Sequence, residues 1–179
     1  MYSWLKKCRS LGLPIDLQLK MFDTMVAPIL LYGCEIWGFE NIDVIESLFL
    51  QFYKIILGVK KSTPNCILYG ELGRFPIKVF VKSRMIGMWK RLICGNQSKM
   101  SAVLYKLLYT MHNRNFFHSK CSIENILNEC GYSEYWLTQN VPKSVCLSKN
   151  VKQRLCDQFK QRWSTNVFNS AKWLNYRIF

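Results

Sequence analysis

The sequence predicts an all-α protein, an irregular multi-helix bundle that can divide into two small helical subdomains. Apolar residues recur at steps of three and four along most of the chain, and glycine follows the last apolar residue of five such blocks. No comparable stretch alternates apolar and polar residues, as a half-buried strand would. A chain of 179 residues with 50% hydrophobic content can also bury a core.

The first predicted helix opens at Pro14 and carries Asp16 in its first turn. Pro28 cannot donate a backbone hydrogen bond, so we expect the helix to kink or restart there, and Gly33 should loosen it again. The apolar residues of this helix recur every four positions, at Leu17, Met21, Met25 and Ile29.

Two strongly periodic blocks follow, at residues 42–56 and 77–92, and each predicts an amphipathic helix. Between them, Thr63 is expected to cap a short helix that starts at Pro64 and ends at Leu72. Glycine tolerates the left-handed backbone conformation that closes a helix. The glycines that follow apolar blocks therefore mark predicted helix ends, at Gly12, Gly58, Gly73, Gly95 and Gly131.

A further helix is expected at residues 96–111, whereas residues 113–120 are polar and aromatic without a period and suggest a loop. We therefore divide the chain into a helical region at 1–112, a linker at 113–120 and a basic helical region at 121–179. A long amphipathic helix is predicted near the end by a series with four-residue steps, Val151, Leu155, Phe159, Trp163 and Val167.

The charge is strongly positive and grows toward the C-terminus. The formal net charge is +14, with 12 cations against 7 anions in residues 1–90 and 13 against 4 in residues 91–179. Such a surplus favours polyanions, which makes RNA or DNA the expected partner, although an anionic membrane surface would match the same charge. No apolar run is long enough to span a membrane and the start lacks a signal peptide, so we expect an intracellular protein, in the nucleus or cytoplasm.

Catalytic chemistry is not expected. Two-metal polymerases and nucleases need converging carboxylates, but no two of the four aspartates are adjacent, and no phosphate-binding loop or cofactor motif occurs. The eight cysteines are scattered singly through apolar patterns, which favours free buried thiols over disulfides. A zinc or thiol site built from His112, His118, Cys121 and Cys130 stays open as a less favoured alternative, because only His118 and Cys121 are closely spaced.

Two groups of basic residues are candidates for phosphate contacts. Lys60 and Lys61 precede a predicted helix N-terminus, where backbone N–H groups also favour anions. The charges of the helix at 77–92 border its apolar stripe, which fits phosphate contact and an ordinary solvated helix equally well. The candidates in this second group are Arg74, Lys78, Lys82 and Arg84.

The C-terminal stretch mixes cations, including Lys152 and Arg162, with aromatic residues. This combination suits single-stranded nucleic acid, because cations follow the backbone while rings stack on bases. For Phe159 and Trp163 the helical spacing favours a place in the core instead. Trp173 and Tyr176 lie beyond the regular pattern and are expected at a surface or against another segment.

The apolar run at residues 27–38 carries three residues that we expect to be structural, Tyr32, Glu35 and Trp37. A buried carboxylate must be hydrogen-bonded, so Glu35 is expected to accept from backbone or tyrosine donors and to fix helix packing. Catalysis by Glu35 is less favoured, because no second titratable group stands nearby in sequence.

Three ordered motifs lie within residues 13–92. They are Tyr-Gly-x-Glu-x-Trp-Gly at 32–38, Leu-Gly-Val-Lys-Lys-Ser-Thr-Pro-Asn at 57–65 and Tyr-Gly-Glu-Leu-Gly-Arg-x-Pro at 69–76. Together they resemble the region just after the palm domain in non-LTR retrotransposon reverse transcriptases. Gln-Arg-Trp at 161–163 with Lys-x-x-x-Tyr-Arg at 172–177 resembles a fourth block of the same family.

The resemblance implies a helical thumb and connector, which in the family helps to hold the template–primer duplex. The paired aspartates of the palm are missing, and so is the Cys/His-rich segment that often follows in the family. We therefore expect a non-catalytic C-terminal fragment of an RNA-directed DNA polymerase. The alternatives are a helical protein-interaction module without a nucleic-acid role and, less favoured, the thiol or zinc enzyme.

Overall fold

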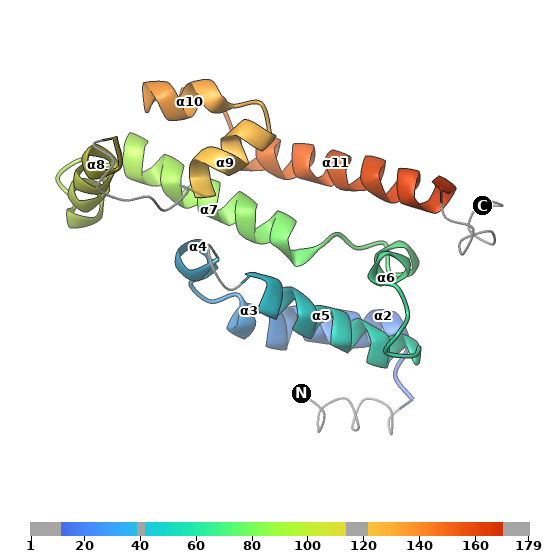
Figure 1. The fold of residues 1–179 in the computed structure, drawn as a ribbon. Helices are drawn as coiled ribbons and strands as arrows, with labels where there is room; N and C mark the ends of the chain where they lie inside the picture. The colour runs from blue at the N-terminus through green and yellow to red at the C-terminus, as the bar shows by residue number, and fades with distance from the viewer. Residues whose placement is uncertain (1–11, 39–41, 114–121, 170–179) are drawn as a thin grey trace.

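The computed structural model describes residues 12–38, 42–113 and 122–169, and these residues form helices and no strands. The predicted all-α fold is therefore confirmed. Figure 1 shows two layers of helices: α5 (Ile42–Leu57) lies beside the N-terminal helices in one, and α7 (Ile77–Cys94) lies beside α11 (Leu147–Asn169) in the other.

The N-terminal helix changes its winding before Pro28. α2 (Ile15–Met21) continues into a π-helical turn (Phe22–Val26) and then into α3 (Ala27–Leu30), so the predicted restart is confirmed. Pro28 cannot donate to the carbonyl of Thr24 and its ring would clash with it, and the wider π turn accommodates both effects.

The series at four-residue steps in this helix does not mark its core face. Met25 and Ile29 are 56% and 76% exposed, and Leu17 is exposed as well. The core is reached by Leu19 and Phe22 instead. Because the segment is apolar on both sides, its periodicity predicts the helix correctly but leaves the buried face undetermined.

The predicted helices at 42–56 and 64–72 are observed as α5 and as α6 (Asn65–Glu71). Phe52 of α5 stacks on Phe22, with ring centroids 3.6 Å apart, which joins α5 to the N-terminal helix. Gly58 follows α5 with a positive φ of 66°. The start of α6 was predicted one residue early: Pro64 has an extended ψ of 136° and is the N-cap, so Thr63 lies outside the helix.

Gly95 differs from the other predicted helix-ending glycines, because its φ of −82° is not left-handed. The next helix, α8 (Met100–Asn113), begins four residues later than predicted. The side chain of Asn96 explains the delay: its Oδ1 accepts from the backbone N–H and the hydroxyl of Ser98, which stabilises a turn in place of a helix.

α7 is the central helix of the molecule. It contacts α4 (Cys34–Trp37), α5, α8, α9 (Ser122–Glu129) and α11. α11 runs antiparallel to α7, since Ser83 donates to the Ser148 carbonyl at one end of α11 while Phe75 lies against Phe159 farther along. Figure 1 shows this pair above α5, with α6 at one end.

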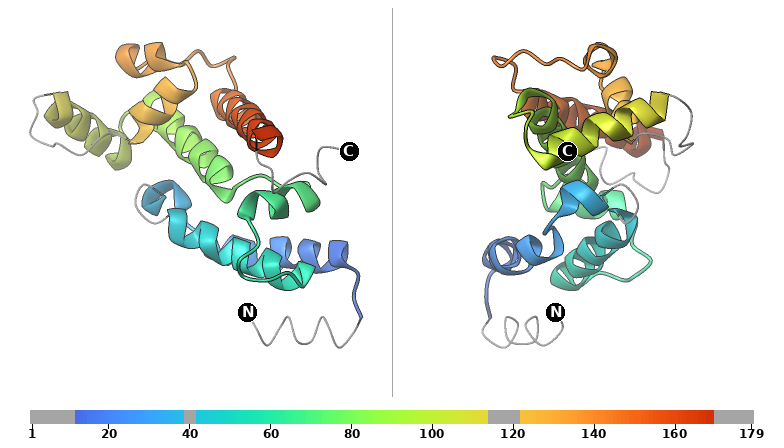
Figure 2. Two further views of the ribbon diagram at one scale, coloured as in Figure 1. Left: turned by 45° about the vertical axis from the view of Figure 1, so that its right-hand side comes forward. Right: turned by 90° about the vertical axis from the view of Figure 1, so that its left-hand side faces the viewer.

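Helices α8 and α10 (Ser133–Thr138) lie at the other end of α7 (Figure 2). Trp89 donates to the hydroxyl of Tyr105 on α8, which donates in turn to Gln139 after α10. Buried residues from α2 to α11 form one hydrophobic cluster, so the described residues on both sides of the predicted linker share a core. The linker itself, at 113–120, lies almost entirely outside the described residues, and the division at that point stays a prediction.

Candidate nucleic-acid interface

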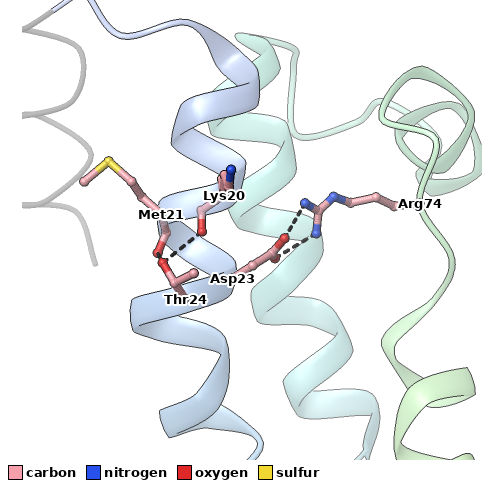
Figure 3. A network of polar contacts seen from close by, with 5 residues as sticks. All are labelled: Lys20, Met21, Asp23, Thr24 and Arg74. Atoms are coloured by element: carbon pink, nitrogen blue, oxygen red, sulfur yellow. Dashed lines mark hydrogen bonds and ion pairs between the residues drawn. The ribbon is translucent and has the colours of Figure 1, made fainter.

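Arg74 joins the segment before α7 to the N-terminal helix. Its guanidinium donates to both carboxylate oxygens of Asp23, at 2.8 and 2.6 Å, and lies 5.7 Å from the ring centroid of Tyr53. Figure 3 shows the forked contact beside Thr24, whose hydroxyl donates to the carbonyls of Lys20 and Met21. The hydrogen bonds to Asp23 raise the pKa of Arg74. This predicted phosphate contact therefore serves in the structure as a link between helices.

Two further candidates on α7 also face carboxylates. Lys78 lies 3.4 Å from Asp43 of α5, and both groups are well exposed. Lys82 lies 2.7 Å from Glu129 of α9. Exposed pairs of this kind contribute little to stability, but each one partly neutralises a cation that would otherwise attract phosphate.

Arg84 is paired with Glu35, which corrects the expected tyrosine donor, whereas the expected backbone hydrogen bond to Glu35 is present. Two guanidinium nitrogens of Arg84 donate to one carboxylate oxygen at 3.0 and 2.6 Å, so the side-chain donor is an arginine rather than a tyrosine. Burial acts to raise the pKa of Glu35, but its backbone hydrogen bond and the charge of Arg84 outweigh burial and lower the pKa overall. Glu35 thus fixes α4 against α7, as expected of a structural carboxylate.

Trp37 and Gly38, in the same motif at 32–38, also contribute to helix packing. The indole Nε1 of Trp37 donates to the carbonyl of Tyr32 at 2.7 Å, whereas the Tyr32 ring itself is exposed. Gly38 is buried, and a Cβ at this position would overlap with Val81 of α7. The glycine therefore permits the close approach of α4 to α7.

Glu46 is a buried carboxylate that the sequence analysis did not single out. It accepts from the hydroxyl of Tyr69 and from the backbone N–H groups of Ile77 and Lys78, the latter two at 3.2 and 3.0 Å. Those N–H groups belong to the first turn of α7, where an anion is favoured by the helix dipole. Burial and the hydrogen bond to Glu46 raise the pKa of Tyr69 far above its ordinary value, so the phenol stays a donor.

Lys60 and Lys61 lie exposed in the turn between α5 and α6. The ammonium group of Lys54 donates to the carbonyl of Lys61 at 2.7 Å, which fixes the turn. Neither Lys60 nor Lys61 forms an ion pair with another described residue. Both cations are therefore available to a phosphate.

α11 carries five exposed cations along its length. Its cations are all exposed, none of them pairs with a described carboxylate, and Asp157 is the one acidic residue of this helix. Asp157 accepts from Gln153 at 3.0 Å instead. The exposed cations of α11 are together called here the α11 basic face. They are Lys149, Lys152, Arg154, Lys160 and Arg162.

Aromatic rings border the α11 basic face along the seam with α7. Lys152 lies 5.9 Å from the ring centroid of Phe80, and Lys160 lies 5.7 Å from that of Phe75. Both rings are more than a third exposed. These rings come from α7 and from the segment just before it, not from the C-terminal stretch in which the sequence suggested interleaved aromatic residues.

The aromatic residues of α11 itself pack inward. Phe159 lies edge-on to Tyr69 at 5.5 Å, and the indole of Trp163 donates to the Cys66 carbonyl of α6 at 2.9 Å. The structure therefore places both side chains against other helices, in line with the favoured interpretation. Trp173 and Tyr176 lie outside the described residues.

In the part of the chain that the structure describes, little supports the alternative of a zinc site or a reactive thiol. No cluster of three or more His, Cys, Asp or Glu side chains there could hold a metal ion. Cys130 is buried, and burial raises the pKa of its thiol, which keeps it protonated and a poor nucleophile. Cys34 and Cys156 are also buried free thiols. His118 and Cys121 lie outside the described residues, and whether they bind a metal stays open.

Over residues 12–38, 42–113 and 122–169, which the structure describes, the fold is all-helical and α11 carries exposed cations without a carboxylate partner. No family model, curated protein or solved structure matches the chain. Within the described residues, no helix is both long and apolar enough to cross a membrane.

Proposed function

We propose that the chain is a non-catalytic nucleic-acid-binding protein that corresponds to the thumb and connector region behind the palm of a non-LTR reverse transcriptase. In this proposal it acts in the nucleus or cytoplasm and holds template–primer nucleic acid by charge. The three motifs at 32–38, 57–65 and 69–76 support the family assignment. The pairing of Glu35 with Arg84 gives the first of these motifs a physical role, because it holds α4 on α7.

The observation that carries the proposal is the difference between paired and unpaired cations. Arg74, Lys78, Lys82 and Arg84 face carboxylates, whereas the α11 basic face has no described anionic partner. When unpaired cations along one helix neutralise phosphates, the counterions condensed on the nucleic acid are released, and this release favours binding. We therefore assign phosphate contact to the α11 basic face, with Lys60 and Lys61 as further contacts beyond α6.

The test is the salt dependence of binding to a labelled RNA–DNA primer–template, measured by fluorescence anisotropy with the full chain. If three of the α11 cations contact phosphates, the affinity should fall roughly 40-fold between 50 and 200 mM salt. A parallel titration with single-stranded RNA separates the two substrate forms, since stacking on Phe75 and Phe80 would favour the single strand.

No measurable binding at 50 mM salt would overturn the proposal. Binding that hardly responds to salt would also contradict it, because contacts to phosphates lose affinity as salt rises. A helical interaction module without a nucleic-acid role is the second candidate. It is favoured by an exposed apolar face on α8, which is a separate feature of the molecule.

A further inference from the structure

The inner face of α8 is fully engaged with its neighbours. Ala102 is buried, and the hydroxyl of Tyr105 accepts from Trp89 and donates to Gln139, at 2.7 Å in both cases. Tyr109 lies edge-on to Trp136 of α10, with ring centroids 5.4 Å apart. These contacts fix how α8 is rotated about its own axis, so its opposite face is held away from the core.

That opposite face is apolar as well. Its residues recur at steps of three and four, which places them on one side of the helix. Exposure ranges from 49% at Leu104 to 73% at Met100. An apolar stripe of this spacing is the surface by which a helix binds another helix. The residues of this outer stripe are Met100, Val103, Leu104, Leu107 and Leu108.

The charges beside the outer stripe select its partner. Lys99 and Lys106 are seven residues apart and border the same side of the stripe, in the way that flanking charges border a coiled-coil seam. Residues 95–113 contain no aspartate or glutamate. A second copy of the chain would therefore bring lysine and another net charge of +14 to the same surface, which is repulsive.

We propose that the outer stripe of α8 docks an acidic amphipathic helix of a partner protein. Leucine-type residues of the partner would pack on Leu104 and Leu107, and its carboxylates would face Lys99 and Lys106. This surface is separate from the α11 basic face, and the proposal goes beyond nucleic-acid binding.

The probe is a pair of designed amphipathic helical peptides of about 20 residues. Both carry the same leucine stripe, flanked by glutamate in one and by lysine in the other, and a third peptide scrambles the acidic sequence to control for charge alone. With the full chain, fluorescence anisotropy should show the acidic helix binding at least about tenfold more tightly than the other two.

Variants locate the binding on α8. Leu104→Glu with Leu107→Glu should abolish binding of the acidic helix, while Leu137→Glu, an exposed leucine on α10, should leave it unchanged. Lys99→Glu with Lys106→Glu should reverse the preference between the acidic and basic peptides. Nucleic-acid affinity should stay unchanged in the leucine variants, which separates the two functions.

Three results would overturn the proposal. Equal affinity for the three peptides would remove the selectivity, and a dimer in sedimentation that Leu107→Glu abolishes would make a second copy the occupant. A clear fall in the Tm of the free protein on Leu107→Glu would show that the stripe packs within the chain itself. Circular dichroism on the same variants confirms that each one folds.

Discussion

The antiparallel helices α7 and α11 are both rich in cations, but they use them differently. Lys82 and Arg84 of α7 are held by carboxylates of α9 and α4, so these two charges contribute to the architecture. The cations of α11 face solvent or the rings of Phe75, Phe80 and Tyr132. The difference teaches that basic composition alone does not locate a binding surface, because the position of the carboxylates decides which cations stay available.

The largest expected effect comes from detaching the N-terminus of α7. Glu46→Ala leaves the Tyr69 hydroxyl and the N–H groups of Ile77 and Lys78 without their acceptor. Buried donors that lose a partner are costly, and we expect a loss of about 3 kcal/mol. Thermal denaturation should show a Tm lower by about 6–12 °C.

Two other variants test the cause of that loss. Glu46→Gln keeps one acceptor oxygen and should lose about half as much stability. Glu134→Ala, at an exposed glutamate on α10, should change stability by less than about 0.5 kcal/mol. If Glu46→Ala were as mild as Glu134→Ala, the role of Glu46 as the acceptor for the first turn of α7 would be wrong.

The next prediction compares the two helices directly by nucleic-acid binding. Lys152→Ala with Lys160→Ala removes two cations of the α11 basic face, and Lys78→Ala with Lys82→Ala removes the same charge from α7. The α11 variant should make the slope of log Kobs against log salt shallower by about 2, because each lost phosphate contact accounts for about 0.9. The α7 variant should leave the slope nearly unchanged.

Both variants carry the same change in net charge, so a general electrostatic effect would move the two slopes equally. Equal slopes would therefore contradict the distinction between paired and unpaired cations. Circular dichroism should confirm that both variants fold, since the exposed pairs on α7 contribute less than about 1 kcal/mol each.

The pair of Glu35 and Arg84 should make stability depend on pH. The pKa of Glu35 is lowered on folding, so the folded state binds fewer protons and this contribution is fully present above about pH 4.5. It should be lost as the pH falls through the lowered pKa. We expect Glu35→Gln to be about 1 kcal/mol less stable than the wild type at pH 7 by urea denaturation, with the difference shrinking toward pH 3.

Asp43→Asn is the matched control for this pair. Asp43 lies 3.4 Å from Lys78 and is 84% exposed, so its removal should change stability very little at any pH. If the difference in stability between wild type and Glu35→Gln stays constant down to pH 3, Glu35 stabilises α4 by packing rather than by its charge.

Most of the fold followed from the sequence, because local rules determine where helices begin and end. The stripe at 42–56 and the glycine at 58 predicted α5 correctly. The same stripe also indicates a buried carboxylate, because Glu46 falls four residues after Ile42 and three before Phe49, on the apolar face. A carboxylate in that register must be buried and needs donors.

Which distant residues form hydrogen bonds and ion pairs with one another could not be derived from local sequence patterns. Glu35 and Arg84 are 49 residues apart, and only the packing of α4 on α7 brings them together. The outer stripe of α8 shows the same limit. Its spacing predicted a helix, but α8 is apolar on two sides, and only the contacts of Tyr105 and Tyr109 decide which side faces the core.

The smallest expected effect compares two glycines that face α11. Alanine normally stabilises a helix by about 0.5–1 kcal/mol relative to glycine. A Cβ at Gly87 of α7 would lie 3.6 Å from that of Ser148, an ordinary contact, so Gly87→Ala should gain this amount. A Cβ at Gly70 of α6 would lie 2.9 Å from the Trp163 ring.

Gly70→Ala should therefore displace the Trp163 ring, weaken its hydrogen bond to the Cys66 carbonyl, and lower stability by about 0.5 kcal/mol or more. Urea denaturation of both variants should show a gain in stability for Gly87→Ala and a loss for Gly70→Ala. In a Trp163→Leu background the smaller side chain leaves room for the new methyl group, so Gly70→Ala should then be stabilising. If Gly70→Ala stabilised the wild-type protein as much as Gly87→Ala, the close fit of α6 on α11 would be wrong.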